Sequence, residues 1–197
     1  MRDGLFDAED GANTPLSPEE RDGLIPTYIT TRNELNDAEH ANTSDVDRWA
    51  FARRRDVLNQ PFLRALHKRM FGKVWRWAGT FSQESNRRIG VDHWRIEVEL
   101  GDLIDTVRYW VAHQTYAPDE IAVRFHHKLT WIHAFPNGNG RHARLAADLL
   151  AVSLQPRPFT WGSAGLVGIT GLREGYVAAL RAADAHDIEP LLAFARS

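Results

Sequence analysis

The sequence contains no cysteine, no long apolar run and no excess of charge of one sign. Without cysteine, disulfides and thiolate metal sites are excluded, and a reducing compartment is the natural expectation. Nowhere do about eighteen apolar residues run together, the length that a membrane-spanning helix needs. The net charge of -2 provides no basic face for the phosphates of a nucleic acid. Because residues 1–21 also lack the apolar segment of a secretory signal, we expect a cytoplasmic protein with neither nucleic acid nor membrane as partner.

Helical signals fill most of the chain, whose 197 residues suffice for one domain with a hydrophobic core. Capping residues, prolines and glycines place the helix starts, and apolar residues at three- and four-residue steps indicate the buried faces. Helices are expected to start near Ser17, after Pro26, and near Ser44, Pro61, Asp92, Pro118, Asn139, Gly171 and Asp187. The helix that starts at Pro118 is expected to bury Ile121, Ala122, Phe125, Leu129 and Ile132.

The segment GTFSQESNRRIGV, residues 79–91, breaks the helical pattern. It carries turn-forming residues between β-compatible ends, which indicates a β-hairpin or an extended loop over Phe81 to Val91. The fold class predicted from the residues is therefore a mainly helical single domain with one short hairpin.

The stretch HAFPNGNGRHAR, residues 133–144, carries more chemistry than a turn between helices requires. Its glycines let successive backbone N–H groups point into one concavity, and the start of the next helix adds unsatisfied donors. Arg141 and Arg144 lie three residues apart on one helix face, where both can reach phosphate oxygens. His133 ends the preceding helix and is suited to accept a proton near neutral pH. Together these parts predict a phosphate cradle facing a general base, although a helical corner with surface arginines and a partly buried histidine shares several of these features.

This stretch resembles the signature of the Fic (Fido) family, His-x-Phe-x-(Asp/Glu)-Gly-Asn-Gly-Arg-x-x-Arg. The matching positions are His133, Phe135, Gly138, Asn139, Gly140, Arg141 and Arg144. The resemblance extends over roughly residues 55–195, and residues 31–42 are similar to a subgroup called mobile mystery protein B. It implies an N-terminal arm with helices over residues 1–54 and a Fic-like catalytic core over residues 55–197.

The resemblance also implies an activity and a role for each matching residue. A helical core with a β-hairpin flap over the active-site loop would transfer AMP, or another nucleoside monophosphate, from ATP to a Ser, Thr or Tyr hydroxyl of a target protein. His133 would deprotonate that hydroxyl. The residues Gly138, Asn139, Gly140 and Arg141 would hold the phosphates, Arg144 would reach the distal phosphate, and Phe135 would anchor the loop. The hairpin would align the target segment by backbone pairing.

One position departs from the signature: Asn137 stands where the family has an acid that holds Mg²⁺. Magnesium prefers carboxylate oxygens, and an amide oxygen brings no charge. We therefore expect Mg²⁺ binding, with ATP as donor, to be weakened at Asn137.

The leader TTRNELN resembles the family's inhibitory pattern Ser/Thr-x-x-x-Glu-Gly/Asn, with Thr30 and Glu34 in register. A carboxylate held against Arg144 would occupy the guanidinium that orients the distal phosphate and would repel the incoming polyanion. Glu34 is therefore the expected inhibitory residue, and Glu39 is the second candidate.

Three alternatives remain open at this point. A transition-metal site could use His126, His127 and His133, but no carboxylate stands at a chelating spacing. A nucleotide-binding regulatory protein with little transfer activity is favoured by Asn137 and opposed by His133, because a protein that only binds nucleotide needs no base. Transfer or removal of another phosphate-linked group is the third alternative.

Overall fold

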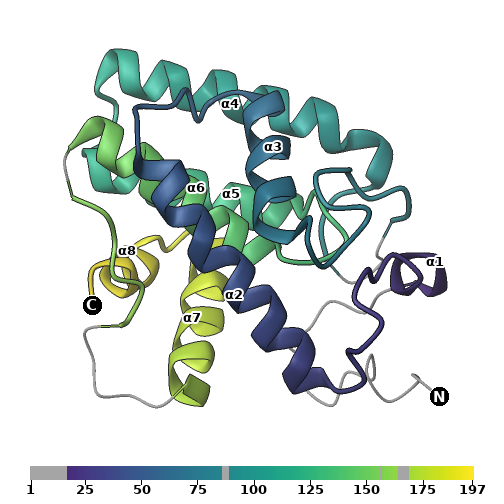
Figure 1. Cartoon of the computed structure of the whole chain (residues 1–197). Helices are drawn as coiled ribbons and strands as arrows, with labels where there is room; N and C mark the ends of the chain where they lie inside the picture. The colour runs from purple at the N-terminus through teal and green to yellow at the C-terminus, as the bar shows by residue number, and fades with distance from the viewer. Residues whose placement is uncertain (1–16, 86–88, 156, 164–168) are drawn as a thin grey trace.

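The computed structural model describes residues 17–85, 89–155, 157–163 and 169–197. Its helices are α1 (Pro18–Arg21), α2 (Arg32–Phe51), α3 (Gln60–Phe71), α4 (Ile96–His113), α5 (Pro118–Ile132), α6 (Asn139–Leu154), α7 (Ile169–Asp184) and α8 (Glu189–Arg196), with a short 3₁₀ turn, η2 (His93–Arg95), leading into α4 (Figure 1). The predicted mainly helical fold class is confirmed. Among the described helices, none combines the length and the apolar character that a membrane span requires.

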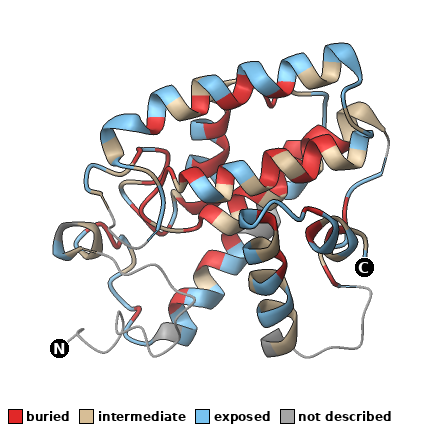
Figure 2. Cartoon of the chain, turned by 180° about the vertical axis from the view of Figure 1, so that it is seen from behind, coloured by how far each residue is buried: buried red, intermediate tan, exposed pale blue. Residues whose placement is uncertain are grey.

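Helices α5 and α6 form the centre of the fold and pack against each other more extensively than any other pair of described elements. Figure 2 shows that the buried residues concentrate in these two helices and in the faces turned toward them. The five residues predicted to line the buried face of α5 are all buried. On α6 the residues that face the core include alanines with no exposed surface, Ala143, Ala146, Ala147 and Ala151. Small side chains let two helix axes approach closely, so this pair holds the loop between them rigidly.

Helix α2 is one continuous helix, so the prediction that a new helix starts at Ser44 is wrong. Thr31 caps it: its side chain accepts from the Glu34 N–H at 3.3 Å, and the Glu34 carboxylate accepts from the Thr31 N–H at 3.0 Å. The buried residues of α2 recur at four- and three-residue steps through the predicted break: Leu35, Glu39, Asn42, Val46 and Ala50. Two of these buried residues, Glu39 and Asn42, are polar, so the apolar residues alone do not show that the buried stripe is continuous. Packing along the whole stripe overrides the local capping signal at Ser44.

The β-hairpin predicted for Phe81 to Val91 is not seen in the described part of that segment, and residues 86–88 lie outside the described residues. The segment is nevertheless attached at both ends to the loop after α5. The Ser82 N–H donates to the Ala134 carbonyl at 2.9 Å, and the Val91 N–H donates to the Ile132 carbonyl at 3.2 Å. We call residues 82–85 and 89–91 the covering segment, because these bonds place it over the loop that contains His133.

Candidate active site

The loop between α5 and α6 holds the residues of the predicted phosphate cradle. His133 ends α5 in a left-handed backbone conformation, with φ 55°. Gly138 precedes α6 and is also left-handed, with φ 79°. A side chain at position 138 would lie 2.5 Å from the Phe71 ring, so both backbone conformation and space require glycine there.

Asn139 shapes this loop through its side chain. Its amide oxygen accepts from the Phe135 N–H at 2.9 Å, and its amide nitrogen donates to the Phe135 carbonyl at 2.6 Å. Because both polar groups are used and the residue is buried, the Asn139 side chain is not available to a phosphate. Its backbone N–H, in the first turn of α6, has no intrahelical acceptor.

The predicted anion site thus has fewer free hydrogen-bond donors than the signature suggests. The Gly138 N–H donates to the Asn137 side-chain oxygen at 2.7 Å, so Gly138 contributes shape and no free donor. The first-turn N–H groups of Asn139, Gly140 and Arg141 remain for a ligand. Gly140 has no left-handed backbone, and a side chain there would make only ordinary contact, 3.5 Å from the Tyr176 hydroxyl. Nothing in the described protein requires glycine at 140, which points to close approach by a ligand.

His133 is the base candidate, and its surroundings keep the imidazole neutral. Burial lowers its pKa from 6.5 to about 4, although a hydrogen bond with the Thr130 backbone acts in the opposite direction. The covering segment lies directly on this residue, because a side chain at Gly90 would come within 2.7 Å of the His133 Cβ. A neutral imidazole at pH 7 can accept a proton, which is the state that a general base needs.

His67 on α3 supports the loop, a role that no sequence pattern indicated. Its Nδ1 accepts from the Gly79 N–H at 3.0 Å, which leaves Nε2–H to donate to the Asn137 carbonyl at 3.0 Å. The imidazole stacks on Phe135 with ring centroids 3.7 Å apart. Complete burial holds the His67 pKa well below its ordinary value. One neutral histidine therefore fixes α3, the loop after α3 at Gly79 and the loop after α5 relative to one another.

The carboxylate that reaches the predicted anion site belongs to Glu39, the second candidate for the inhibitory residue. Glu39 is 2% exposed and forms an ion pair with the Arg141 guanidinium. Its other carboxylate oxygen accepts from the Trp75 indole at 2.6 Å and from the Asn137 amide nitrogen at 3.3 Å. Arg141 also lies over the Phe71 ring, 5.0 Å from its centroid. The charge of Arg141 is therefore already balanced inside the protein.

The structure does not show the predicted contact between Glu34 and Arg144. The exposed Glu34 carboxylate accepts from the backbone N–H groups of Thr30, at 2.8 Å, and Thr31, at 3.0 Å. These bonds lower the Glu34 pKa. Because the carboxylate caps its own helix, Glu34 is a helix-starting residue. The motif register that selected Glu34 describes a helix N-terminus equally well.

Asn137 does not offer an oxygen to a metal in this arrangement. Its side-chain oxygen accepts from Gly138, and its nitrogen faces Glu39. Both contacts demand the same amide orientation, because an N–H must meet an oxygen and a carboxylate must meet a donor. The described residues contain no group of three histidine or acidic side chains placed to bind a metal ion. The residues at this point therefore do not fit a magnesium site.

The histidines of α5 are engaged in other contacts. His126 lies 3.0 Å from the Tyr176 hydroxyl, and His127 lies 2.8 Å from the Asp184 carboxylate. These residues tie α5 to α7, so the transition-metal alternative gains no support from their positions.

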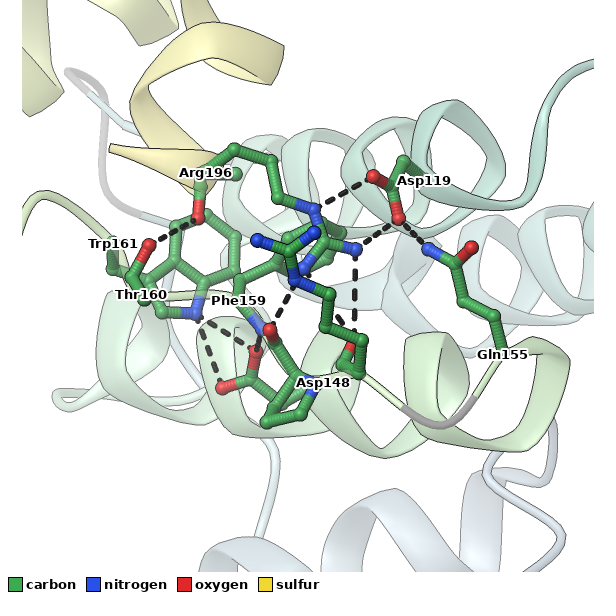
Figure 3. Close-up of polar contacts among 10 residues, drawn as sticks. Asp119, Asp148, Gln155, Phe159, Thr160, Trp161 and Arg196 are labelled. Carbon is green, nitrogen blue, oxygen red and sulfur yellow. Dashed lines mark hydrogen bonds and ion pairs between the residues drawn. The ribbon is translucent and has the colours of Figure 1, made fainter.

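Arg144 lies one turn beyond Arg141 and faces the C-terminal part of the molecule. Its guanidinium is 5.3 Å from the Tyr176 ring centroid, and its Nε donates to the Gly140 carbonyl at 3.4 Å. One turn further, the Asp148 carboxylate accepts from the Phe159 N–H and the Trp161 indole (Figure 3). Burial raises the Asp148 pKa to about 7, and the nearby Arg144 charge acts against this shift. Helix α6 thus carries the predicted anion site at its start, and in its middle it carries Asp148, which holds residues 159 and 161.

A second set of contacts in Figure 3 attaches the C-terminal residues to α5. The Arg196 side chain forms an ion pair with Asp119 at the start of α5, and it donates to the Pro158 carbonyl at 2.8 Å. The backbone of Thr160 donates to the Ala195 carbonyl at 2.9 Å. Helix α8 and the loop before α7 are therefore held against the α5 and α6 pair.

About half of the sequence is similar to a known protein family. Residues 57–151 match the sequence model of the Fic/DOC family, which confirms the assignment made from the signature. No curated protein matches the sequence. The assignment to the mobile mystery protein B subgroup stays a prediction.

Solved structures of Fic domains share the fold. One is the N-terminal Fic domain of a VirB-translocated Bep effector from Bartonella quintana, with a TM-score of 0.70 and 16% identity over 88% of this chain and 90% of that chain. Another is BepC from Bartonella tribocorum with bound AMPPNP, with a TM-score of 0.68 and 14% identity over 90% of this chain and 96% of that chain. A Bartonella quintana Bep Fic domain with bound ADP has a TM-score of 0.65 and 16% identity over 99% of this chain and 94% of that chain.

Proposed function

Residues 57–151 of this chain form a Fic/DOC domain, and on this premise we propose that the protein is a nucleotidyltransferase that moves AMP from ATP to a hydroxyl of a target protein. The observation that carries the proposal is a neutral His133 beside a helix N-terminus with free donors and Arg144. The solved Fic domains with AMPPNP and ADP support a nucleotide as the ligand. The lack of cysteine supports a cytoplasmic setting.

The proposed step uses one base and one anion site. The His133 imidazole accepts the proton of a Ser, Thr or Tyr hydroxyl of the target as its oxygen attacks the α-phosphorus of ATP. The bond from that phosphorus to the oxygen bridging the α- and β-phosphates breaks, and pyrophosphate leaves. The N–H groups of Asn139, Gly140 and Arg141 stabilise the negative charge of the phosphates, and Arg144 binds the distal phosphate. At pH 7 the His133 imidazole is already neutral, because burial lowers its pKa to about 4.

We further propose that residues 1–54 restrain a catalytic core formed by residues 55–197. Glu39 on α2 occupies the Arg141 guanidinium, and its carboxylate faces the place where phosphates would bind. Like charges at this distance repel, so nucleotide would bind weakly or with its α-phosphate out of line for attack. Removal of the Glu39 carboxylate should therefore raise transfer.

The second candidate is a nucleotide-binding regulatory protein with little transfer activity. Two observations favour it: the family's metal-binding acid is replaced by Asn137, and Glu39 already satisfies Arg141. Transfer or removal of another phosphate-linked group would use the same base and the same anion site.

Incubation of the protein with radiolabelled ATP and cell lysate separates these candidates. We expect labelled protein bands with the wild type or, more strongly, with Glu39→Gly, and none with His133→Ala. Nucleotide binding by His133→Ala should stay within a few-fold of wild type, because the imidazole accepts a proton and does not hold phosphates. Binding without label in Glu39→Gly would support the regulatory candidate.

A further inference from the structure

A cavity of about 440 Å³ opens beside the covering segment, on the surface between α3 and the loop that follows it. Its walls are Gln60, Pro61, Arg64, Ala65 and Lys68 of α3, residues 78–81 of the loop, and Glu97 of α4. The buried Phe81 and Ala78 give it an apolar floor, and the charged residues lie at its mouth. The cavity is large enough for one or two side chains of a bound peptide.

Two cations on the α3 wall lack an acidic partner among the described residues. Arg64 and Lys68 are exposed and one helical turn apart, so both face the cavity from one side. The Lys68 ammonium makes no hydrogen bond or ion pair to a described residue. The half-buried Arg124, by contrast, is paired with Glu120 at 2.7 Å. The positive charges of Arg64 and Lys68 are therefore available to a ligand in the cavity.

Two contacts fix the orientation of the Arg64 side chain. Its Nε donates to the Gly79 carbonyl at 3.0 Å, and its guanidinium lies 5.1 Å from the Phe81 ring centroid. These contacts fix the side chain and leave its two terminal nitrogens for an anion. A guanidinium fixed in this way loses less conformational freedom when it binds a carboxylate. Glu97 on the opposite wall repels an acid, so an acidic ligand would lie on the α3 side.

The cavity is linked to the proposed site of transfer through Phe81. Phe81 forms part of its floor and packs against Phe135 with ring centroids 5.5 Å apart. The next residue, Ser82, donates its N–H to the Ala134 carbonyl beside His133. A peptide that follows the covering segment toward His133 therefore passes the mouth of the cavity.

We propose that this cavity binds an acidic side chain, aspartate or glutamate, of the target protein, close in its sequence to the hydroxyl that is modified. The proposal rests on the proposed transfer to a protein hydroxyl and names a preference for targets with an acid near that hydroxyl. Lys68 and Arg64 supply the charge, and Phe81 supplies the apolar contact for the methylene groups of the acidic side chain.

Binding of short labelled peptides to the full chain tests the proposal without any nucleotide. The probe is a fluorescein-labelled peptide with tyrosine flanked by two glutamates on each side, and its control has glutamine in place of glutamate. Fluorescence anisotropy should show that the glutamate peptide binds about tenfold more tightly, as expected for one charge-assisted contact. Lys68→Gln should remove most of this preference. The matched control Arg53→Gln removes one exposed positive charge away from the cavity and should retain the preference.

Three results would overturn the proposal. The first is equal binding of the two peptides. The second is an equal loss of the preference for glutamate in Lys68→Gln and Arg53→Gln. The third is a loss of this preference in Arg144→Gln but not in Lys68→Gln, which would place the peptide in the anion site. The outcome can be told apart from that of the proposed function. If the acidic peptide binds but Glu39→Gly transfers no label, the proposal for the cavity stands and the proposed nucleotidyltransferase activity is wrong.

Discussion

At the residue scale, the side chains of the active-site loop divide into those that hold its shape and those that remain for a ligand. Asn139 and His67 use all of their polar groups on backbone atoms of the loop and its neighbours. Asn137 uses its amide to join Gly138 to Glu39. The amide at 137 is thus explained by the neighbouring carboxylate, because an acid there would face Glu39 at about the same distance.

The pairing predicts the effect of Asn137→Asp. Two carboxylates would lie side by side, so the free energy of unfolding should fall by about 1–3 kcal/mol, the cost of an unsatisfied buried polar group. The change also supplies the oxygen charge that magnesium prefers, so magnesium-dependent nucleotide binding should rise. Urea unfolding and nucleotide titration with and without Mg²⁺ measure the two effects.

The double variant Glu39→Gln with Asn137→Asp is the control, because glutamine can donate to the new carboxylate. It should recover most of the lost stability. If Asn137→Asp is as stable as wild type, the amide does not hold Glu39.

The two glycines of the loop should respond differently to alanine. Gly138→Ala should lower the free energy of unfolding by more than about 1 kcal/mol, because the residue is left-handed and faces Phe71. Gly140→Ala should leave stability unchanged or slightly raised, because alanine favours a helix, and should weaken ATP binding through a methyl group in the anion site. Thermal unfolding and nucleotide titration of both variants check this, and intact ATP binding in Gly140→Ala would show that phosphates bind elsewhere.

Residues 133–144 could be predicted as a loop with a base and an anion site because spacing along a short segment determines which groups converge. Glu39 and Arg141 lie 102 positions apart, and His67 and Asn137 lie 70 apart. No local spacing reports such contacts. The sequence indicated Glu39 only as the second candidate, and its pairing with Arg141 and the support from His67 became apparent from the packing of α2 and α3 against α6.

At the element scale, the approximate positions of the described helices were predictable, whereas their number was not, because nine starts were expected and eight α-helices are described. The errors lie where packing overrides local signals. A capping serine placed the start of α1, and prolines placed the starts of α3 and α5 to within a residue. Both signals are local, because they act on the backbone of the first helical turn. Ser44 carries the same signal inside α2 and is overruled by the buried stripe on both sides of it. The covering segment was predicted as a hairpin from its turn residues, whereas its described residues bond to the loop after α5.

Glu34 and Glu39 of α2 differ in position, and their removal should have different effects. Glu34→Ala should lower the thermal unfolding temperature, because the first turn of α2 loses its cap. It should leave transfer and nucleotide binding at wild-type levels, because the exposed carboxylate contacts only Thr30 and Thr31. Calorimetry and label incorporation, with Glu39→Gly as the reference, measure both properties. Activation by Glu34→Ala equal to that by Glu39→Gly would restore the original assignment of Glu34.

At the scale of the whole molecule, buried neutral histidines link stability to pH. Burial lowers the pKa values of His67, His126, His133 and His142, the last from 6.5 to about 4. The unfolded chain binds more protons than the folded chain between these values, so stability is full above about pH 6.5 and is lost as the pH falls toward 4. Asp148 acts in the opposite direction, because its raised pKa favours the folded state at lower pH.

Urea unfolding followed by tryptophan fluorescence should therefore show a marked loss of stability between pH 6.5 and 4. His142 alone accounts for about 3 kcal/mol, the equivalent of its pKa shift. His142→Asn should reduce the slope, since an amide can still donate to the Leu63 carbonyl, and the exposed His113→Asn should not. A flat profile over this range would contradict the burial of neutral histidines.

The central claim, that His133 and the anion site transfer a nucleotide, is tested most directly by the position of the label. Glu39→Gly is incubated with lysate and ATP labelled at either the α- or the γ-phosphate, beside the double variant Glu39→Gly with His133→Ala. The account predicts that protein acquires the α-label but not the γ-label, and that the double variant acquires neither. Transfer of the γ-label, or α-labelling that persists without His133, would contradict it.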